Sequence, residues 1–237
     1  MKYINIDDRL RAVSNMICGE VIADVGSDHA YLPIWLYLNQ KIKKAYALDI
    51  SENCVTKIKI NLKKYSVPED IVIPVLSDGF SCFDSKYDFN ELTDIIIAGI
   101  GGNNISKIIE KIYETKNIKN INFIFQPSGK IEILREYLYK NKFDIIQEII
   151  ITKENEKRIY NIINAKFTNK TYKPKPIEII IGKNVNHQGY INKTIKHLVN
   201  ILKDLNKSGD KKYNIKTDFG YYKDIENLIS ELELRKS

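Results

Sequence analysis

The chain has 237 residues, 43% of them hydrophobic, and a formal net charge of +7. It is long enough to bury a core of its own, and it has no apolar run of the roughly 18 residues that a membrane span needs. Three scattered cysteines and three scattered histidines, without a CxxC pair or a secretory leader, argue against a disulfide scaffold and a zinc site. We therefore expect a cytoplasmic protein with no metal and no membrane partner.

Short apolar runs alternate with segments of helical periodicity through the first half of the chain. The expected helices cover residues 30–39, 51–65, 102–115 and 129–141. The expected strands are Val21–Val25, Ala45–Ile50, Ile71–Leu76, Asp94–Ala98 and Ile121–Gln126. This alternation predicts right-handed crossovers and a mostly parallel sheet with helices on both faces.

Two further apolar runs follow without a helix between them. They are Asp144–Ile151 and Arg158–Phe167, and the polar gap Thr152–Lys157 is too short for a helix, so an antiparallel hairpin is expected. A Rossmann-like α/β sheet that ends in such a hairpin is typical of class I methyltransferases, which use S-adenosylmethionine (SAM). A dinucleotide-binding sheet would continue with another βα unit. We place this SAM-binding methyltransferase domain at residues 1–167.

The rest of the chain divides into a linker and a helical appendage. Residues 168–184 contain Pro174, Pro176 and a short strand-like run, Ile177–Ile181. Residues 185–237 contain two series of apolar residues spaced three and four apart, which predict an antiparallel helical coiled-coil hairpin. The two series are Ile191, Ile195, Leu198, Leu202, Leu205 and Tyr221, Ile225, Leu228, Leu232.

Charge is unevenly distributed along the chain. Residues 1–150 hold 19 Lys and Arg and 20 Asp and Glu, whereas residues 151–237 hold 18 and 10, a net charge of +8. A concentrated basic region attracts polyanions, so it favours an RNA partner bound through the appendage. The alternative is that Lys, in a chain rich in Ile, Lys and Asn, only fills the surface. That alternative does not explain why the first 150 residues are neutral.

The end of the first strand carries the first candidate site. Gly26 permits a tight turn, and Asp24 and Asp28 are acceptors for the ammonium group of a methionine moiety. The dinucleotide fingerprint GxGxxG is absent, because Asp28 and Tyr31 stand where its second and third glycines would fall. This favours SAM over a nicotinamide cofactor. The simpler interpretation is that Gly26 and Asp28 only form a turn.

The next two strand ends supply further acceptors. Asp49 is placed to accept ribose hydroxyls, and Asp78 to accept the amine of an adenine, with Gly79 allowing close backbone contact. Each residue is also a common turn or helix-start residue. Because the carboxyl ends of parallel strands share one edge, their agreement with the first site strengthens the prediction of an adenosine ligand.

The fourth strand ends with three glycines, Gly99, Gly101 and Gly102, which leave room for a flat base. The Asp/Asn-Pro-Pro-aromatic box of exocyclic-amine methyltransferases is absent. A ring nitrogen already presents a lone pair, so catalysis needs mainly positioning. The glycines are also explained by close helix–strand packing.

Other candidates have two interpretations each. Gln126 lines a base pocket or only ends a strand, and Tyr31 stacks on a base or packs inside. His29 is a proton shuttle or fixes its loop. Arg9 and Arg11, on a first helix, contact phosphate or are merely exposed.

Several strings resemble one known family. These are ADVGSDHAYLP (23–33), DGF (78–80), IAGIGG (97–102) and FQPSG (125–129), joined by RLRAV (9–13) and IYNIINA (159–165). They resemble the bacterial tRNA adenine-N1 methyltransferases of the TrmK type over essentially the whole chain. The resemblance implies SAM-dependent methylation of N1 of the adenine at tRNA position 22. Departures are Asp49 for Glu, Ile100 for Met, and Gly182-Lys183 for Gly-Pro.

The resemblance also implies a set of functional residues. The cofactor contacts it implies, with Ile50 added beside Asp49, are Asp24, Gly26, Ser27, Asp28, His29, Asp49, Ile50, Asp78, Gly79, Gly99, Gly101 and Gly102. Positioning of the base and the methyl group is expected from Asp28, Tyr31, Gly99 and Gly101. The alternatives are a methyltransferase acting on another RNA or on protein, a non-catalytic RNA-binding relative, and a nicotinamide-dependent oxidoreductase, which the missing fingerprint disfavours.

Overall fold

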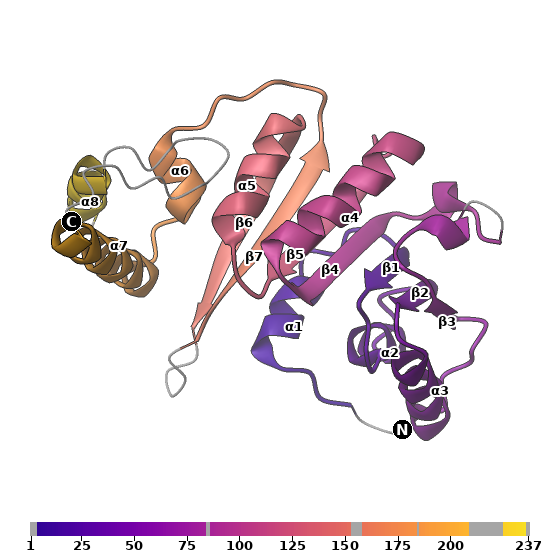
Figure 1. The fold of residues 1–237 in the computed structure, drawn as a ribbon. Coiled ribbons are helices and arrows are strands. Elements are labelled where there is room, and N and C mark those ends of the chain that lie inside the picture. The colour runs from indigo at the N-terminus through magenta and orange to yellow at the C-terminus, as the bar shows by residue number, and fades with distance from the viewer. Residues whose placement is uncertain (1–3, 84–85, 153–157, 184, 209–224, 236–237) are drawn as a thin grey trace.

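The computed structural model describes residues 4–83, 86–152, 158–183, 185–208 and 225–235 (Figure 1). Its centre is a seven-stranded sheet with the strand order β3-β2-β1-β4-β5-β7-β6. β7 runs antiparallel to the two strands on either side of it, and all other pairings are parallel, so the predicted parallel sheet and closing hairpin are confirmed. The strands are β1 (Val21–Val25), β2 (Lys44–Asp49), β3 (Val72–Leu76), β4 (Asp94–Ile100), β5 (Asn122–Pro127), β6 (Phe143–Thr152) and β7 (Ile159–Phe167).

Helices cover both faces of the sheet and bury a separate apolar core on each. One core lies against α1, α2 and α3, and the other against α4 and α5. Central strands are therefore apolar on both sides, as Ile95, Ile96 and Ile97 of β4 show by being fully buried. The bounds are α1 (Asp8–Ser14), α2 (Tyr31–Leu38), α3 (Glu52–Tyr65), α4 (Gly102–Thr115) and α5 (Ile131–Lys140).

The run Ile177–Ile181, expected to be a strand, is a helix, α6 (Pro176–Ile181). Pro176 occupies its first turn, where the missing N–H costs nothing, and the Glu178 carboxylate accepts a hydrogen bond from the Lys175 backbone N–H at 2.7 Å. Each residue from Ile177 to Ile181 is buried. A short helix buried all round shows no helical periodicity, and this is why its β-branched composition predicted a strand.

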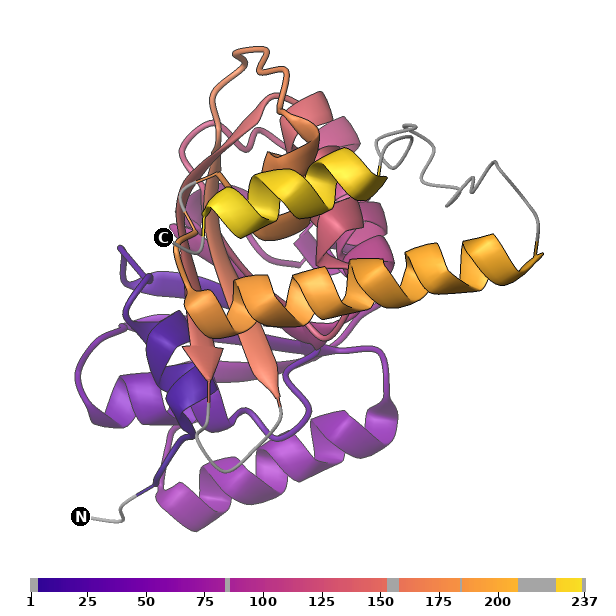
Figure 2. The same cartoon turned by 90° about the vertical axis from the view of Figure 1, so that its left-hand side faces the viewer.

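Two helices follow, α7 (Gln188–Ser208) and α8 (Ile225–Leu234), and Figure 2 shows them running in opposite directions along each other. They share an apolar cluster with α6, built around Ile191, Leu198, Leu228 and Leu232. The predicted helical appendage is therefore present, while its coiled-coil geometry stays a prediction. Tyr221, which belongs to the second expected series, lies outside the described residues.

Within the described ranges, no helix combines the length and the apolar character that crossing a membrane requires. The same residues contain no group of three or more His, Cys, Asp or Glu side chains able to hold a metal ion.

Candidate functional site

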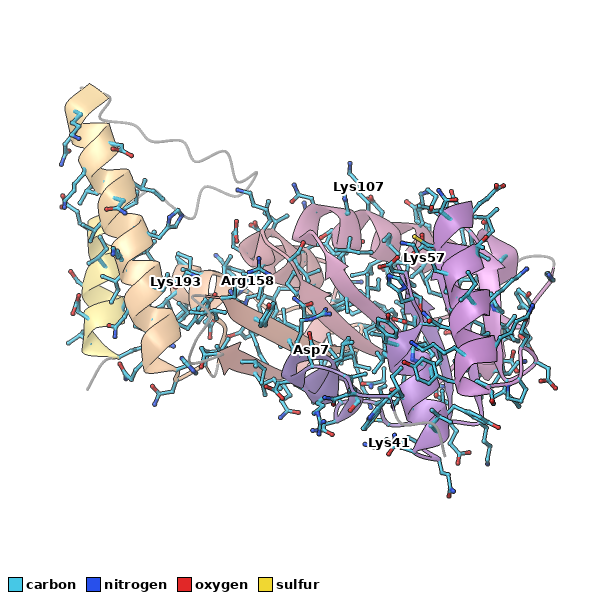
Figure 3. The ribbon with its side chains drawn as sticks, turned by 90° about the horizontal axis from the view of Figure 1, so that it is seen from below. Asp7, Lys41, Lys57, Lys107, Arg158 and Lys193 are labelled. Carbon is cyan, nitrogen blue, oxygen red and sulfur yellow. The ribbon has the colours of Figure 1, made fainter. Side chains whose placement is uncertain are left out.

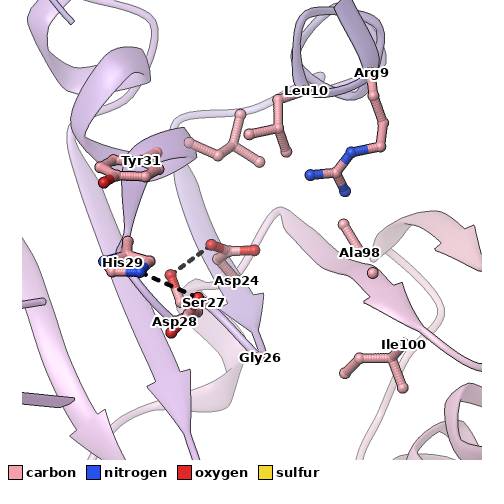
Figure 4. A pocket seen from close by; sticks show the side chains of 12 residues that line it. Arg9, Leu10, Asp24, Gly26, Ser27, Asp28, His29, Tyr31, Ala98 and Ile100 are labelled. Atoms are coloured by element: carbon pink, nitrogen blue, oxygen red, sulfur yellow. Dashed lines mark hydrogen bonds and ion pairs between the residues drawn. The ribbon is translucent and has the colours of Figure 1, made fainter. Parts of the chain in front are cut away.

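A cavity of about 300 Å³ opens at the carboxyl ends of β1 and β4, under α1 (Figure 4). Its floor is the turn after β1, where Gly26 has φ of +74° and Asp28 and Ala30 also adopt left-handed conformations. The backbone N–H groups of Gly26 and Ser27 both donate to the Leu48 carbonyl, at 2.9 and 3.0 Å. The turn is thus tied to β2, and these two amides are not available to a ligand.

Asp24 is the buried acid of this cavity. Asp24 is 6% exposed, and its carboxylate accepts a hydrogen bond from Ser27 Oγ at 2.6 Å. Burial raises the pKa of Asp24 to about 6, although the Ser27 hydrogen bond and the nearby charge of Arg9 act in the opposite direction. A carboxylate held so far from water is stabilised by a cationic ligand, and this fits its predicted role.

Asp49 lies at the end of β2, and its carboxylate holds two backbone groups. Oδ2 accepts from the Asp28 N–H at 3.1 Å, and Oδ1 accepts from the Ser51 N–H at 3.0 Å. Each oxygen keeps a second lone pair, so Asp49 both fixes the turn and can accept a further donor. The next residue, Ile50, is 75% exposed, which leaves a large apolar side chain uncovered beside this acid.

Asp28 lines the cavity and also contacts α3. Its carboxylate Oδ1 lies 3.3 Å from both Cys54 Sγ and Lys57 Nζ. His29 and Tyr31 stack with ring centroids 5.1 Å apart, and Tyr31 is 41% exposed at the cavity. His29 therefore supports an exposed aromatic ring.

Asp78 and Gly79 lie at the same edge of the sheet but do not line this cavity. Asp78 accepts a hydrogen bond from Ser81 Oγ at 3.1 Å and lies 3.6 Å from Lys111 Nζ of α4. Gly79 has φ of +141°, and a Cβ there would meet nothing within 4 Å. Gly79 is buried, whereas the Asp78 side chain is exposed and open to a ligand that extends from the cavity toward β3.

The three glycines after β4 have different surroundings. Gly99, with φ of +78°, forms a bulge where β4 shifts its register against β5. A Cβ on Gly101 would meet nothing within 4 Å, whereas one on Gly102 would lie 2.1 Å from the Lys130 carbonyl oxygen. Gly99 and Gly101 therefore keep space open, and Gly102 is required for packing α4 against the loop before α5.

A second cavity, of about 530 Å³, adjoins the first, and Arg9 and Gly99 line both. Arg9 reaches from α1, and its Nη1 donates to Gln126 Oε1 of β5 at 2.6 Å. Gln126 is 2% exposed, and its Nε2 donates to the Pro127 carbonyl. The other residues that line this cavity are Asp7, Pro127, Ser128, Arg158, Ile159 and Tyr160.

Sequence reasoning singles out Arg9 and Gln126 but misses Asp7, Arg158 and Tyr160. The sequence places Arg158 and Tyr160 in a strand of the hairpin but does not mark them as site residues. No pattern in the sequence marks Asp7 as a site residue either. Arg11, the other arginine suggested for phosphate, bonds to Asn5 Oδ1 and does not line either cavity. The string IYNIINA (159–165), which contains Tyr160, is the signal that points to this side of the cavity.

Comparisons with known proteins agree with this architecture. A sequence profile of the methyltransferase domain matches residues 6–163. The tRNA (adenine(22)-N(1))-methyltransferase of Bacillus subtilis (strain 168) is 32% identical over 167 residues, which cover 70% of this chain and 67% of that protein. The chain belongs to this methyltransferase family.

Solved structures of the family extend the match to the C-terminal helices. The B. subtilis M1A22 tRNA methyltransferase TrmK, 22% identical, superimposes with a TM-score of 0.78 over 99% of this chain and 100% of its own. TrmK of M. capricolum, solved in complex with S-adenosyl-homocysteine (SAH), is 25% identical, with a TM-score of 0.72 over 97% and 96%. The appendage is therefore part of the shared fold.

Proposed function

We propose that this protein transfers the methyl group of SAM to N1 of an adenine in tRNA, at position 22. The observation that carries the proposal is the match to the B. subtilis enzyme, whose name states this reaction. The SAH complex of the M. capricolum relative supports the choice of cofactor. The acids at the strand ends, Asp24 and Asp49, support the proposal with local chemistry.

The residues present suit an adenosine-containing cation. Asp24, buried and with a raised pKa, is stabilised by the ammonium group of the methionine moiety. Asp49 retains lone pairs for the ribose hydroxyls, and an adenine ring would cover the exposed face of Ile50. Asp78 and Gly79 lie farther along the same edge, beyond the cavity, where the adenine would end.

The remaining predicted residues shape this site. Gly26 and Ser27 hold the turn to β2, the Asp28 backbone binds Asp49, and His29 supports Tyr31. Gly99 and Gly101 leave room for the base, and Gly102 holds the start of α4. We assign cofactor contact to the first cavity and its edge toward β3, and base positioning to Tyr31, Gly99 and Gly101.

The reaction makes few demands on acid–base chemistry. SAM supplies a methyl group bonded to a positively charged sulfur. Adenine N1 presents a lone pair at neutral pH, so no residue has to remove a proton before transfer. The protein contributes by aligning the two reactants and excluding water. Alignment alone can raise the reaction rate by several orders of magnitude. The open floor at Gly99 and Gly101 fits this role.

The C-terminal helices are assigned to the body of the tRNA. The chain from residue 151 onward carries the net charge of +8, and Lys196, Lys203 and Lys207 of α7 are exposed. We therefore divide the molecule into a catalytic domain, residues 1–167, and a tRNA-binding appendage, residues 185–237, joined by residues 168–184. Such a substrate places the enzyme in the cytoplasm.

The test is incubation of the purified chain with SAM and unmodified tRNA, followed by nucleoside mass spectrometry. We expect 1-methyladenosine, mapped to position 22 by a block to reverse transcription. A tRNA with guanosine at that position should gain no methyl group. If SAM binds, as calorimetry would show, but no 1-methyladenosine forms, the substrate is another RNA or a protein.

A further inference from the structure

The second cavity is separate from the cofactor site but meets it at Arg9 and Gly99. Gly99 forms the bulge at the end of β4, so a flat group in the second cavity would face the first across a stretch of bare backbone. Figure 3 views the molecule from below and labels Asp7, just before α1, and Arg158, just before β7, which both line the second cavity. The two cavities together are suited to two reactants that meet at Gly99.

The second cavity has the side chains that a nucleotide needs. Arg158 is exposed at its rim and is suited to a phosphate, and Tyr160 offers a ring on which a base can stack. Gln126 is 2% exposed, and its amide binds Arg9 at one end and the Pro127 carbonyl at the other, so its role is to hold Arg9 in place. Asp7 is the one carboxylate that lines this cavity in the described part of the chain.

Asp7 is held in place from two sides. Its Oδ1 accepts a hydrogen bond from the Leu10 N–H at 2.8 Å, which caps α1, and its Oδ2 lies 3.6 Å from Arg9 Nε. Gln126 fixes Arg9 in turn. The Asp7 side chain is nevertheless 42% exposed, so the carboxylate remains open to a further donor.

We propose that the second cavity holds the target adenine, and that Asp7 accepts a hydrogen bond from its 6-amino group. The inference rests on the proposed function and adds to it a selectivity residue. A carboxylate attracts the amine of adenine and repels the carbonyl oxygen that guanine carries at the same position. Asp7 thereby selects adenine by attraction and by exclusion.

The same contact favours the reaction. The N1 lone pair forms the bond to the methyl carbon, and the electron pair of the broken carbon–sulfur bond stays on sulfur. No proton leaves, so the positive charge moves from sulfur to the base, where N1 and the 6-amino group share it as an amidinium. A fixed carboxylate beside the amino group binds the charged product state more strongly than the neutral adenine.

The test compares Asp7→Asn with Asp8→Asn in the full-length chain. Asn keeps the capping acceptor for Leu10, and Asp8 is an exposed acid of the same helix turn that does not line the cavity. We expect Asp7→Asn to lower kcat on unmodified tRNA by about 10- to 100-fold. The affinity for SAH, measured by calorimetry, and the thermal midpoint should match those of Asp8→Asn. Equal kcat values for the two variants would overturn the proposal.

A second measurement needs no turnover. A tRNA carrying purine riboside in place of the target adenosine lacks only the 6-amino group. With SAH present, the wild-type chain should bind the adenosine tRNA more tightly than the purine tRNA, and Asp7→Asn should bind both alike. Equal wild-type affinities would overturn the role of Asp7 even if 1-methyladenosine forms. Absence of 1-methyladenosine from the wild-type reaction would instead overturn the proposed function, and this inference with it.

Discussion

Arg135 of α5 and Glu148 of β6 form a buried ion pair, with Arg135 Nε 3.2 Å from both carboxylate oxygens. Their side chains are 0% and 4% exposed. Arg135 Nη1 also donates to the carbonyls of Ile179 and Ile180 at the end of α6, at 2.8 and 2.6 Å. One guanidinium thus joins the catalytic sheet to the segment that leads into the appendage.

Removing one partner of this pair should destabilise the protein strongly. Arg135→Met or Glu148→Met leaves a buried charge without its counterion, a loss of about 3–5 kcal/mol in the free energy of unfolding. The double variant Arg135→Met/Glu148→Met removes both charges and should recover part of that loss. Urea denaturation of the three variants measures this. If the double variant loses as much free energy of unfolding as the two single variants together, the two charges are not coupled.

SAM affinity should depend on pH through Asp24. Burial raises the pKa of Asp24 from the ordinary 3.8 to about 6, so between these two pH values the folded protein holds a proton that the unfolded chain has lost. The contribution of Asp24 to the free energy of unfolding therefore falls as the pH rises from about 4 to about 6. An ammonium ligand needs the ionised form. Below pH 6 we therefore expect SAM affinity to fall by about tenfold per pH unit. Calorimetric titrations of SAM between pH 5 and 8 test this. In Asp24→Asn the SAM affinity should be low and independent of pH.

Alanine substitutions at the adjacent Gly101 and Gly102 should affect different properties, activity in the first case and stability in the second. Gly101→Ala places its Cβ in open space and should keep the thermal midpoint of unfolding while lowering kcat, because the added methyl group takes up space that we propose for the base. Gly102→Ala forces its Cβ against the Lys130 carbonyl and should lower the midpoint by several degrees. Scanning calorimetry and a methyl-transfer assay on both proteins separate the effects. A normal midpoint for Gly102→Ala would refute the packing role.

Charge reversal on α7 should weaken tRNA binding without affecting the cofactor. In Lys196→Glu/Lys203→Glu/Lys207→Glu we expect a lower tRNA affinity and a shallower dependence of that affinity on salt, by roughly one unit of slope for each lysine that no longer neutralises a phosphate. SAH affinity should be unchanged. The matched control is Lys59→Glu/Lys63→Glu/Lys64→Glu on α3, which makes the same change in net charge. If both triple variants bind tRNA equally weakly, the appendage has no special role.

The sheet was predictable because its parallel strands are short, mostly apolar runs separated by segments of helical periodicity. Val21–Val25 matches its predicted bounds, and the other strands differ by a few residues. The common location of Gly26, Asp49 and Gly99 at one edge of the sheet was predictable as well, because the carboxyl ends of parallel strands share an edge. The prediction failed at Ile177–Ile181 because burial on all sides removes periodicity.

Side-chain direction and long-range pairing were not predictable in the same way. The carboxylate of Asp28 lies 3.3 Å from Lys57 Nζ on α3, a contact that no local pattern in the sequence indicates. Arg9 and Gln126 are 117 positions apart, and no local pattern connects them. Arg135 sits in an apolar helix face next to Leu134, and only the fold shows that Glu148 balances its charge.

The position of α1 across the sheet edge has a consequence for engineering. The strand ends supply the acids proposed to hold the cofactor, whereas the carboxylate proposed to select the base comes from Asp7, immediately before α1. The two recognition tasks are encoded in separate stretches of the chain. Libraries confined to residues 5–8, none of which lines the first cavity, could therefore be screened for a changed choice of base while the methyl-donor site is left intact.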